Sequence, residues 1–322
     1  MKIGVFTVLF QQLPFEAMLD HVRAAGVEAV EIGTGGYPGA AHCQPGELLA
    51  EPARLASFRD AVASRGLTIS ALSCHANPLH PRREVADAAH ATFERTLRLA
   101  HELGVDCVNL FSGCPGDSDQ ARFPNWVTCA WPPDYQELLA WQWNEKVVPY
   151  WQGAAAQARE HGVRLCFEMH PGFVVYNPET LLRLRQACGD NIGANLDPSH
   201  LIWQGIDIPE AIRALGAADA IYHVHAKDTA IDPHNARVNG VLDTKPLDRV
   251  AERSWIFRTL GYGNDLLFWR QFVSTLRQVG YDGVLSIEHE DALASIDEGF
   301  RKAVSVLQQV ILSEQPAQAW WT

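Results

Sequence analysis

The sequence predicts an α/β protein with a (β/α)8 TIM barrel fold in a single domain, and three observations support this prediction. Eight short apolar segments are spread along the 322 residues, and amphipathic segments of helical length lie between them. Hydrophobic residues make up 47% of the chain, which is enough for one large barrel core. No linker or low-complexity segment interrupts the pattern, so we expect a barrel over residues 1–315 and a C-terminal tail over residues 316–322.

The eight predicted strands are continuous apolar runs rather than alternating ones. Parallel strands that are buried on both faces have this pattern, because neither face meets water. We predict strands over residues 3–8, 29–33, 68–73, 107–111, 164–168, 192–197, 221–225 and 284–288.

The segments between the strands carry apolar residues at helical spacing, and glycine closes several of them as a C-terminal cap would. A strand followed by a helix, repeated eight times, is typical of a (β/α)8 barrel. The clearest predicted helices are residues 15–26, 52–66, 91–104, 178–189 and 267–280.

Two connections are too long to be simple loops. Residues 112–142 follow the fourth strand and residues 226–265 follow the seventh, and both contain Trp, Arg and Asn in an irregular context. Both leave the C-terminal ends of strands, the face that carries the active site in such barrels. We interpret them as a lid or substrate wall, with a surface excursion or a subunit contact as the alternative.

Composition and charge exclude several classes of protein. The net charge of -12 argues against a general nucleic-acid binder, which needs a basic face. No apolar run approaches the ~18 residues of a membrane span, and the N-terminal run is too short for a secretory signal. The seven cysteines are dispersed without a CxxC pair, which favours reduced thiols. We therefore expect a cytoplasmic protein that binds neither nucleic acid nor membrane.

Four consecutive predicted strands end in side chains that bind metals. These residues are Glu168, Asp197, His225 and Glu288. A carboxylate at the tip of a buried strand is costly unless it is paired, hydrated or bound to a metal. Taken singly, each of these residues could be a helix cap or an ion-pair partner. Together they predict a divalent-metal site, and oxygen and imidazole ligands suit Mn²⁺, which we favour, as well as Mg²⁺, Co²⁺ or Zn²⁺.

Two further histidines lie close to these residues in the sequence. His223 precedes His225 by two residues and therefore faces the same way, one layer deeper, as a supporting or core histidine. His200 follows Asp197 by three residues. We expect it to reach back over the metal and contact a substrate hydroxyl or carbonyl, with a further metal ligand as the alternative.

Other polar residues follow strand ends on the same face. They are His75, Asn77, His170 and Lys227. His75 and Asn77 could bind a polyol, and His170 could touch substrate or be a structural loop residue. Lys227 could hold a substrate oxygen or pair with Asp228, and Glu290 could cap the final helix.

Four stretches resemble the xylose-isomerase-like superfamily of sugar phosphate isomerases and epimerases. In chain order they read CFEMHPG, NLDPSH, YHVHAKD and LSIEHED. The family includes ketose 3-epimerases, inosose dehydratases and hydroxypyruvate isomerases and, more distantly, AP endonuclease IV. The resemblance extends to the strand–helix pattern of the whole chain. It implies that Glu168, Asp197, His225 and Glu288 bind the metal and that His200 contacts substrate.

The sequence also departs from the pattern of its relatives. Ketose 3-epimerases usually carry a second glutamate where this chain has Val174, and an arginine where it has Ile231. Sugar recognition should therefore differ from theirs. The Asp-x-His pair that the endonuclease needs is missing around residues 238–240. The HPGFVVYNP segment, the His-Ala-Lys-Asp run and the long connection after the seventh strand look more like relatives in glycoside and keto-sugar catabolism. Some of those relatives act on 3-keto-glycosides, including C-glycoside-cleaving lyases that work with a small partner subunit.

The predicted function is that of a metal-dependent sugar isomerase or epimerase. It would abstract a proton next to the carbonyl of a free keto-sugar, with Glu168 and Glu288 as acid and base and an enediolate between the two steps. One alternative is a lyase, inosose dehydratase-like or keto-glycoside-cleaving, which uses the same enolate to expel a leaving group. The other is a non-catalytic metal- and polyol-binding subunit. The expected partners are a small sugar and a second copy of the chain, with a small partner subunit as an alternative.

Overall fold

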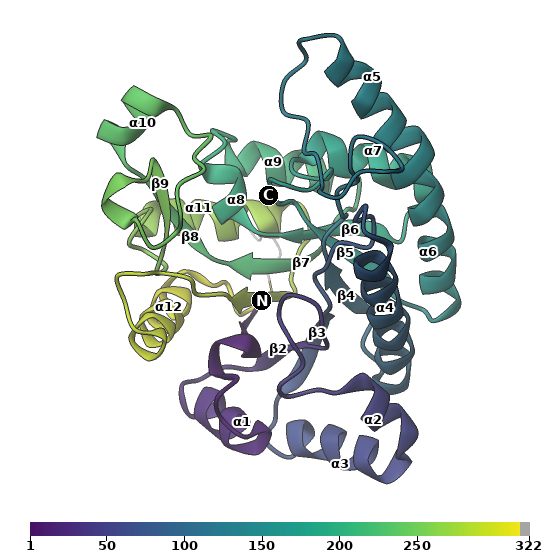
Figure 1. Cartoon of the computed structure of the whole chain (residues 1–322). Helices are drawn as coiled ribbons and strands as arrows, with labels where there is room; N and C mark the ends of the chain where they lie inside the picture. The colour runs from purple at the N-terminus through teal and green to yellow at the C-terminus, as the bar shows by residue number, and fades with distance from the viewer. Residues whose placement is uncertain (316–322) are drawn as a thin grey trace, which may run out of the picture.

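Eight parallel strands form a closed barrel in the computed structural model, which describes residues 1–315. Figure 1 shows the helices surrounding these strands. The order around the barrel is β1-β10-β7-β6-β5-β4-β3-β2. This arrangement confirms the predicted (β/α)8 TIM barrel. The predicted tail, residues 316–322, lies outside the described residues.

The barrel strands lie where the continuous apolar runs predicted them. They are β1 (Lys2–Phe6), β2 (Ala29–Gly33), β3 (Thr68–Ser73), β4 (Cys107–Leu110), β5 (Arg164–Glu168), β6 (Ile192–Leu196), β7 (Ile221–Ala226) and β10 (Val284–Ile287). The largest difference is at the end of β1, because the chain turns into a short 3-10 helix over Thr7–Phe10.

The helices lie around the barrel, and all of them except Asp134–Trp141 and Pro233–Asn239 contain buried residues. They are α1 (Phe15–Ala24), α2 (Pro45–Ala50), α3 (Pro52–Ala63), α4 (Arg83–Leu103), α5 (Asp134–Trp141), α6 (Val148–Glu160), α7 (Pro178–Cys188), α8 (Pro198–Ile202), α9 (Ile208–Gly216), α10 (Pro233–Asn239), α11 (Leu266–Gln278) and α12 (Ile296–Val310). A turn of π-helix over Gln142–Val147 joins α5 to α6, and a 3-10 turn covers Val250–Glu252. No helix in the described part of the chain is long and apolar enough to cross a membrane.

Helix α4 begins eight residues before the predicted helix 91–104. The physical reason is the distribution of its apolar contacts. Its buried residues all lie at Phe93 or beyond, so the first turns carry little of the apolar pattern from which a buried helix is predicted.

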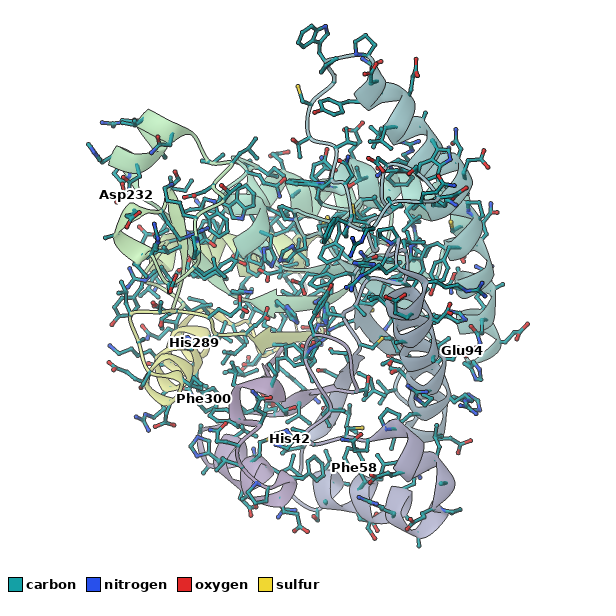
Figure 2. The ribbon with its side chains drawn as sticks, in the orientation of Figure 1. His42, Phe58, Glu94, Asp232, His289 and Phe300 are labelled. Carbon is teal, nitrogen blue, oxygen red and sulfur yellow. The ribbon has the colours of Figure 1, made fainter. Side chains whose placement is uncertain are left out.

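The final helix, α12, packs closely on the chain that leaves β10. Figure 2 shows His289 and Phe300 beside each other in this region. A Cβ atom at Gly299 would lie 2.0 Å from His289 Cε1, so only glycine allows this approach. Phe300 packs edge-on against Phe10, with 5.1 Å between ring centroids. This contact ties the last helix to the 3-10 helix that follows β1, and the pairing of β1 with β10 closes the barrel.

The two long connections contain more regular structure than the sequence predicted. The segment after β4 ends in α5, so its last residues are helical. The segment after β7 contains two antiparallel strands, β8 (Asp228–Ile231) and β9 (Trp255–Arg258), with α10 between them. In Figure 1, α5 stands at the top and α10 at the upper left. The irregular context expected from the sequence is therefore interrupted by regular elements at these places.

Asp228 anchors the connection after β7 and does not pair with Lys227, so the pairing considered from sequence is wrong. Its carboxylate accepts hydrogen bonds from the backbone N–H groups of Gly261, Gly263 and Asn264 at 3.0–3.1 Å. The Asn264 amide adds a bond of 2.7 Å. These contacts hold the chain beyond β9 against β8, and thereby fix the position of β9.

Gly36 brings the loop after β2 against the loop after β3. It has a φ of +70°, and a Cβ atom there would lie 2.2 Å from the carbonyl oxygen of His75. Tyr37 N donates to the same oxygen at 2.8 Å. We expect Gly36→Ala to lower the free energy of unfolding by more than about 2 kcal/mol, because left-handed strain of about 1–2 kcal/mol adds to a backbone clash. Chemical denaturation measures this change.

Gly39→Ala is the matched control for this substitution. Gly39 has nearly the same φ, +72°, but no atom lies within 4 Å of the position that a Cβ would take there. This variant should therefore show the left-handed strain alone. Equal losses in the two variants would mean that the close approach to His75 contributes nothing.

Candidate metal centre

Glu168, Asp197, His225 and Glu288 meet at the C-terminal ends of four neighbouring strands. Strands β5, β6, β7 and β10 are adjacent in this order around the barrel. Each residue offers one ligand atom, and these atoms all lie within 4.8 Å of one another. The structure therefore brings together the four side chains that the strand ends predicted as metal ligands.

The turn after β6 shows how local sequence aims two of the side chains. Asp197 is the N-cap of α8, and its Oδ1 accepts a hydrogen bond from Ser199 N at 2.8 Å. Its other oxygen, Oδ2, faces the cluster and lies 3.9 Å from His225 Nδ1. Pro198 starts the helix, whose first turn carries His200 back over the site. His200 Nε2 lies 3.0 Å from Glu168 Oε1.

The buried negative charge of the cluster calls for a cation. Three carboxylates converge there, and Lys227 is the nearest fixed positive charge, with Nζ 3.2 Å from Glu288 and 3.9 Å from Asp197. Among residues 1–315, Asp197 Oδ2 is buried without a hydrogen-bond partner, whereas Glu288 Oε2 has ion-pair contacts with Lys227 and His225. A buried carboxylate oxygen without a partner is costly, and a divalent cation beside it would remove that cost. The residues present therefore fit a divalent metal.

His225 presents its two ring nitrogens to different groups. Nδ1 lies 3.1 Å from Glu288 Oε2 and 3.3 Å from Glu168 Oε2, whereas Nε2 lies 2.9 Å from Glu31 Oε2. Burial alone would lower the pKa of His225, but Glu31 and Glu288 raise it well above its ordinary value. A metal-binding histidine commonly donates its second N–H to a carboxylate. The geometry thus leaves Nδ1 for a metal.

Glu31 is the partner of His225 that sequence reasoning missed. It lies in the middle of β2, fully buried, and accepts hydrogen bonds from Ser73 Oγ (2.5 Å), Asn109 Nδ2 (2.9 Å) and Ser286 Oγ (2.7 Å). Burial would raise its pKa, but His225 and His223 hold the pKa well below its usual range. The available signal was a lone carboxylate inside the apolar run AVEIG, which is unfavourable in a strand unless it has a partner.

His223 lies one layer below His225, inside the barrel, as strand parity predicted. Its Nδ1 lies 2.9 Å from Asn195 Oδ1, and its Nε2 lies 3.2 Å from Ser70 Oγ. Burial lowers its pKa to about 4, so the ring is neutral at physiological pH. With both nitrogens engaged, His223 supports the centre from beneath.

The two glutamates of the cluster are ionised at neutral pH. Burial would raise the pKa of Glu168, but hydrogen bonds from His200, His225 and His75 hold it well below the ordinary value. Burial acts on Glu288 in the same direction, and Lys227 and His225 overcome it and hold the pKa at about 2. Ionised carboxylates are the form that binds a cation or accepts a proton.

The other predicted site residues are divided between the centre and its surroundings. His75 Nε2 lies 3.0 Å from Glu168 Oε2. His170 stacks near His200, with ring centroids 4.1 Å apart, and burial together with His200 lowers its pKa to about 3. Asn77 instead pairs with the backbone of Cys114, donating to its carbonyl and accepting from its N–H at 3.0 Å each. Its amide therefore fixes the loop after β4 and does not face a ligand.

Lys227 and Glu290 form an ion pair at 2.5 Å beside the centre. The expectation that Glu290 caps the final helix is wrong, because the N-cap of α12 is Ser295. Lys227 Nζ also lies 4.3 Å from the centre of the Phe257 ring. Lys227 thus joins the carboxylate cluster to the aromatic side chains of β9.

A cavity of about 270 Å³, the metal-site cavity, opens above the cluster. Its polar lining residues are Glu168, Glu288, Glu290, His75 and His170, and its apolar lining residues are Phe6, Val8, Tyr37, Pro38 and Phe111. Ligand pockets start at about 300 Å³, so this cavity suits one small ring. A lining of both polar and apolar groups matches a sugar, which carries hydroxyls at its edge and C–H groups on its faces.

Replacing Glu31 by glutamine should weaken metal binding by about 10- to 100-fold, the usual effect of losing the carboxylate behind a metal-bound histidine. Glutamine keeps the shape but not the charge that orients His225. Titration calorimetry with Mn²⁺ measures the affinity. Glu28→Gln, at an exposed position three residues earlier, is the control. An unchanged affinity in Glu31→Gln would exclude this role.

Comparisons with known proteins agree with the barrel fold. A family model described as xylose isomerase-like TIM barrel matches residues 19–310. The uncharacterized protein YfiH of Bacillus subtilis (strain 168) is 39% identical over 314 residues, which cover 97% of this chain and 99% of that protein.

Solved structures share the fold over nearly the whole chain. A xylose isomerase domain protein from Planctomyces limnophilus aligns with a TM-score of 0.65 at 20% identity, covering 96% of both chains. A D-psicose 3-epimerase, solved in the presence of D-fructose, aligns with a TM-score of 0.60 at 18% identity, covering 97% of this chain and 99% of the other. At these identities the likeness establishes the fold.

Proposed function

Because the chain belongs to the xylose isomerase-like TIM barrel family, we propose that it is a divalent-metal-dependent sugar isomerase or epimerase. One observation carries the proposal. Two ionised glutamates, Glu168 and Glu288, line a cavity of the size of a sugar ring and come from the outer two of four adjacent strands. A protein that only binds a sugar has no need of two such bases.

Glu168, Asp197, His225 and Glu288 would hold the metal, for which Mn²⁺ is our first choice on the donor set. When bound, the cation supplies Lewis-acid polarisation of a substrate carbonyl. Glu31 holds His225 in the tautomer that leaves Nδ1 unprotonated for the cation. The oxygen-rich donor set with a single imidazole disfavours metals that prefer thiolates.

The two glutamates would move the proton. One carboxylate accepts the proton from the carbon next to the carbonyl, and the C–H electron pair becomes the double bond of an enediolate. The other carboxylate takes up a proton from water and delivers it to the same carbon from the opposite face, which inverts that centre, and the first carboxyl then releases its proton to water. If the proton is instead returned to the former carbonyl carbon, and a second proton moves between the two enediolate oxygens, ketose and aldose are interconverted.

The neighbouring groups would orient the bases and the substrate. His200 and His75 each hold one oxygen of Glu168 at 3.0 Å, which fixes the direction of that carboxylate. Lys227, 3.2 Å from Glu288, places a positive charge where negative charge develops on the enediolate oxygens. His170, neutral and at the edge of the cavity, would hydrogen-bond a substrate hydroxyl.

Deuterium incorporation tests this proposal. The Mn²⁺-loaded protein is incubated in D₂O with free ketoses, inososes and 3-keto-glycosides, and the sugars are then separated and weighed by mass spectrometry. We expect deuterium next to the carbonyl together with a new stereoisomer or aldose. Loss of water or of an aglycone would assign a lyase instead. A metal-loaded protein that exchanges none of these sugars would contradict the proposal.

A further inference from the structure

A second cavity, of about 380 Å³, lies beside the metal centre, and we call it the aromatic cavity. The residues that matter here are Trp126, Trp203, Trp255, Phe257, His170 and His200. Trp126 comes from the connection after β4, whereas Trp255 and Phe257 belong to β9 in the connection after β7. The two long connections of the sequence therefore meet at one ligand-sized space.

The aromatic cavity adjoins the metal-site cavity through a pair of histidines. His170 lines both cavities. His200 lines the aromatic cavity and lies 3.0 Å from Glu168 Oε1, so it reaches the cluster from that side. The two imidazole rings are 4.1 Å apart. A ligand at the metal centre that extends past these histidines enters the aromatic cavity.

The wall of the aromatic cavity is a packed row of rings. Trp203 and Trp255 stack nearly parallel, with 4.6 Å between their ring centroids and 4° between their ring planes. Phe257 packs edge-on against Trp255 at 5.2 Å and against His200 at 5.3 Å. The Arg253 guanidinium also lies 4.5 Å from the centre of the Trp255 ring, so the row is a packed, preorganised apolar wall rather than an open flat face.

The charged residues of this cavity are already paired with protein groups. Asp243 accepts from Ser254 N at 2.6 Å and from Lys245 N at 2.9 Å, and it pairs with Lys245 Nζ at 3.0 Å. The Arg253 guanidinium is buried and donates to Trp255 O at 3.1 Å. Because these charged groups are paired with one another or with the backbone, they are not free to bind a charged ligand. The cavity therefore favours a neutral ligand over a phosphate.

Two indole N–H groups of the cavity wall point to a ligand with oxygen atoms. Nε1 of Trp126 and Nε1 of Trp203 are buried without an acceptor in the part of the chain that the structure describes. Trp203 is itself 95% buried, with 5% of its surface exposed. A hydroxyl or ether oxygen on a ligand would supply the missing acceptor.

We propose that the aromatic cavity is a subsite for a second, neutral ring, so that the substrate is a glycoside rather than a free monosaccharide. This inference rests on the proposed function. The keto-sugar lies in the metal-site cavity, and its substituent ring lies against Trp255 and Phe257. The shared chemistry is a ring with a flat apolar face, which either a second sugar or an arene provides.

Matched sugars test the inference. The probes are 3-keto-D-glucose, its methyl and phenyl β-glycosides, and 3-keto-cellobiose, all with Mn²⁺-loaded full-length protein. Calorimetry measures binding, and deuterium exchange follows the reaction. We expect the phenyl glycoside or the disaccharide to bind at least about tenfold more tightly than the methyl glycoside. Preference for the phenyl compound assigns an arene, and preference for the disaccharide assigns a second sugar.

Variants locate the preference in the aromatic cavity. In the wild type we expect the phenyl glycoside or the disaccharide to bind more tightly than the methyl glycoside. Trp126→Ala and Trp255→Leu should each bring the ratio of these two affinities close to one. Trp126 is only partly buried, so its variant should fold even if the Trp255 variant does not. Trp131→Ala is the control, because Trp131 lies in the same connection and is 75% exposed. It should keep the wild-type ratio.

Two results would overturn the inference, and they differ in what they say of the proposed function. Equal affinity for all four sugars, with exchange still observed, would remove the subsite and leave the isomerase or epimerase proposal standing. Absence of binding and exchange with every sugar would remove both. A preference that persists in Trp126→Ala and Trp255→Leu would place the second ring elsewhere and would also overturn the inference.

Discussion

Replacing Glu288 by glutamine is expected to reduce turnover by at least about 100-fold, the usual scale for losing a general base, while leaving the barrel folded. Glu288 directly follows β10, lines the metal-site cavity and is 13% exposed, so it is accessible to a ligand there. Its pKa of about 2 keeps the carboxylate ionised, and therefore free of a proton, at neutral pH. Glutamine has the same shape and still offers an oxygen to a cation, but it cannot take the proton.

The role of Glu288 as a general base can be separated experimentally from its role as a metal ligand. Turnover is measured at saturating Mn²⁺, and the metal content of each variant is determined. In a two-base epimerase, removing one base leaves the other able to exchange the proton of one epimer. We therefore expect Glu288→Gln to exchange the proton of one epimer with D₂O and Glu168→Gln to exchange that of the other epimer. Both variants should interconvert the two epimers more slowly than the wild type.

Glu298→Gln is the control for this series, because Glu298 is exposed in the first turn of α12, away from the cavity. It should keep wild-type kinetics. Normal interconversion by Glu288→Gln at full metal occupancy would show that the acid–base assignment is wrong.

Adding Mn²⁺ to metal-free protein is expected to raise the melting temperature, and Asp197→Asn should lose most of that rise. Binding at 100 times Kd stabilises a folded protein by about 2.7 kcal/mol, or roughly 5 °C for a chain of this size. Asp197 Oδ2 is buried at the cluster without a hydrogen-bond partner among residues 1–315. Asparagine keeps the Oδ1 that caps α8 but replaces the charged Oδ2 at the cluster with an uncharged amide nitrogen.

Asp207→Asn is the matched control, since Asp207 also caps a helix through its side chain but lies outside the cluster. It should melt like the wild type and show the full metal-dependent rise. Scanning fluorimetry, with and without chelator, gives all of these values. The same rise in Asp197→Asn as in the wild type would remove Asp197 from the ligand set.

Much of the barrel could be predicted from sequence because its strands are buried on both faces. Such strands are continuous apolar runs, and AVEIG and RLCFE coincide with β2 and β5 residue for residue. Parallel strands of a barrel end on one rim, so the strand pattern alone was enough to group Glu168 at the tip of β5 with Asp197 after β6. The local D-P-S-H turn then indicated that His200 lies near Asp197.

The long connections could not be predicted in the same way. Asn77 was predicted as a polyol-binding residue because it follows β3, yet its amide binds the backbone of Cys114, 37 residues away. Asp228 looked like a partner for the adjacent Lys227, yet it binds a loop more than 30 residues further on. In both cases the backbone of a distant loop provides the hydrogen bonds that a buried amide or carboxylate requires, and no local pattern reveals them.

The sequence by itself determined the barrel architecture and the set of strand-end side chains that converge on one rim, because both follow from local burial and the period of a strand. Only the tertiary structure decided which groups face each other across the barrel. Glu31 supports His225 from 194 residues away, and Trp126 shares a cavity with Trp255 across two separate connections. These pairings depend on the closure and register of eight strands and on loop packing, which are long-range properties that periodicity within one segment does not encode.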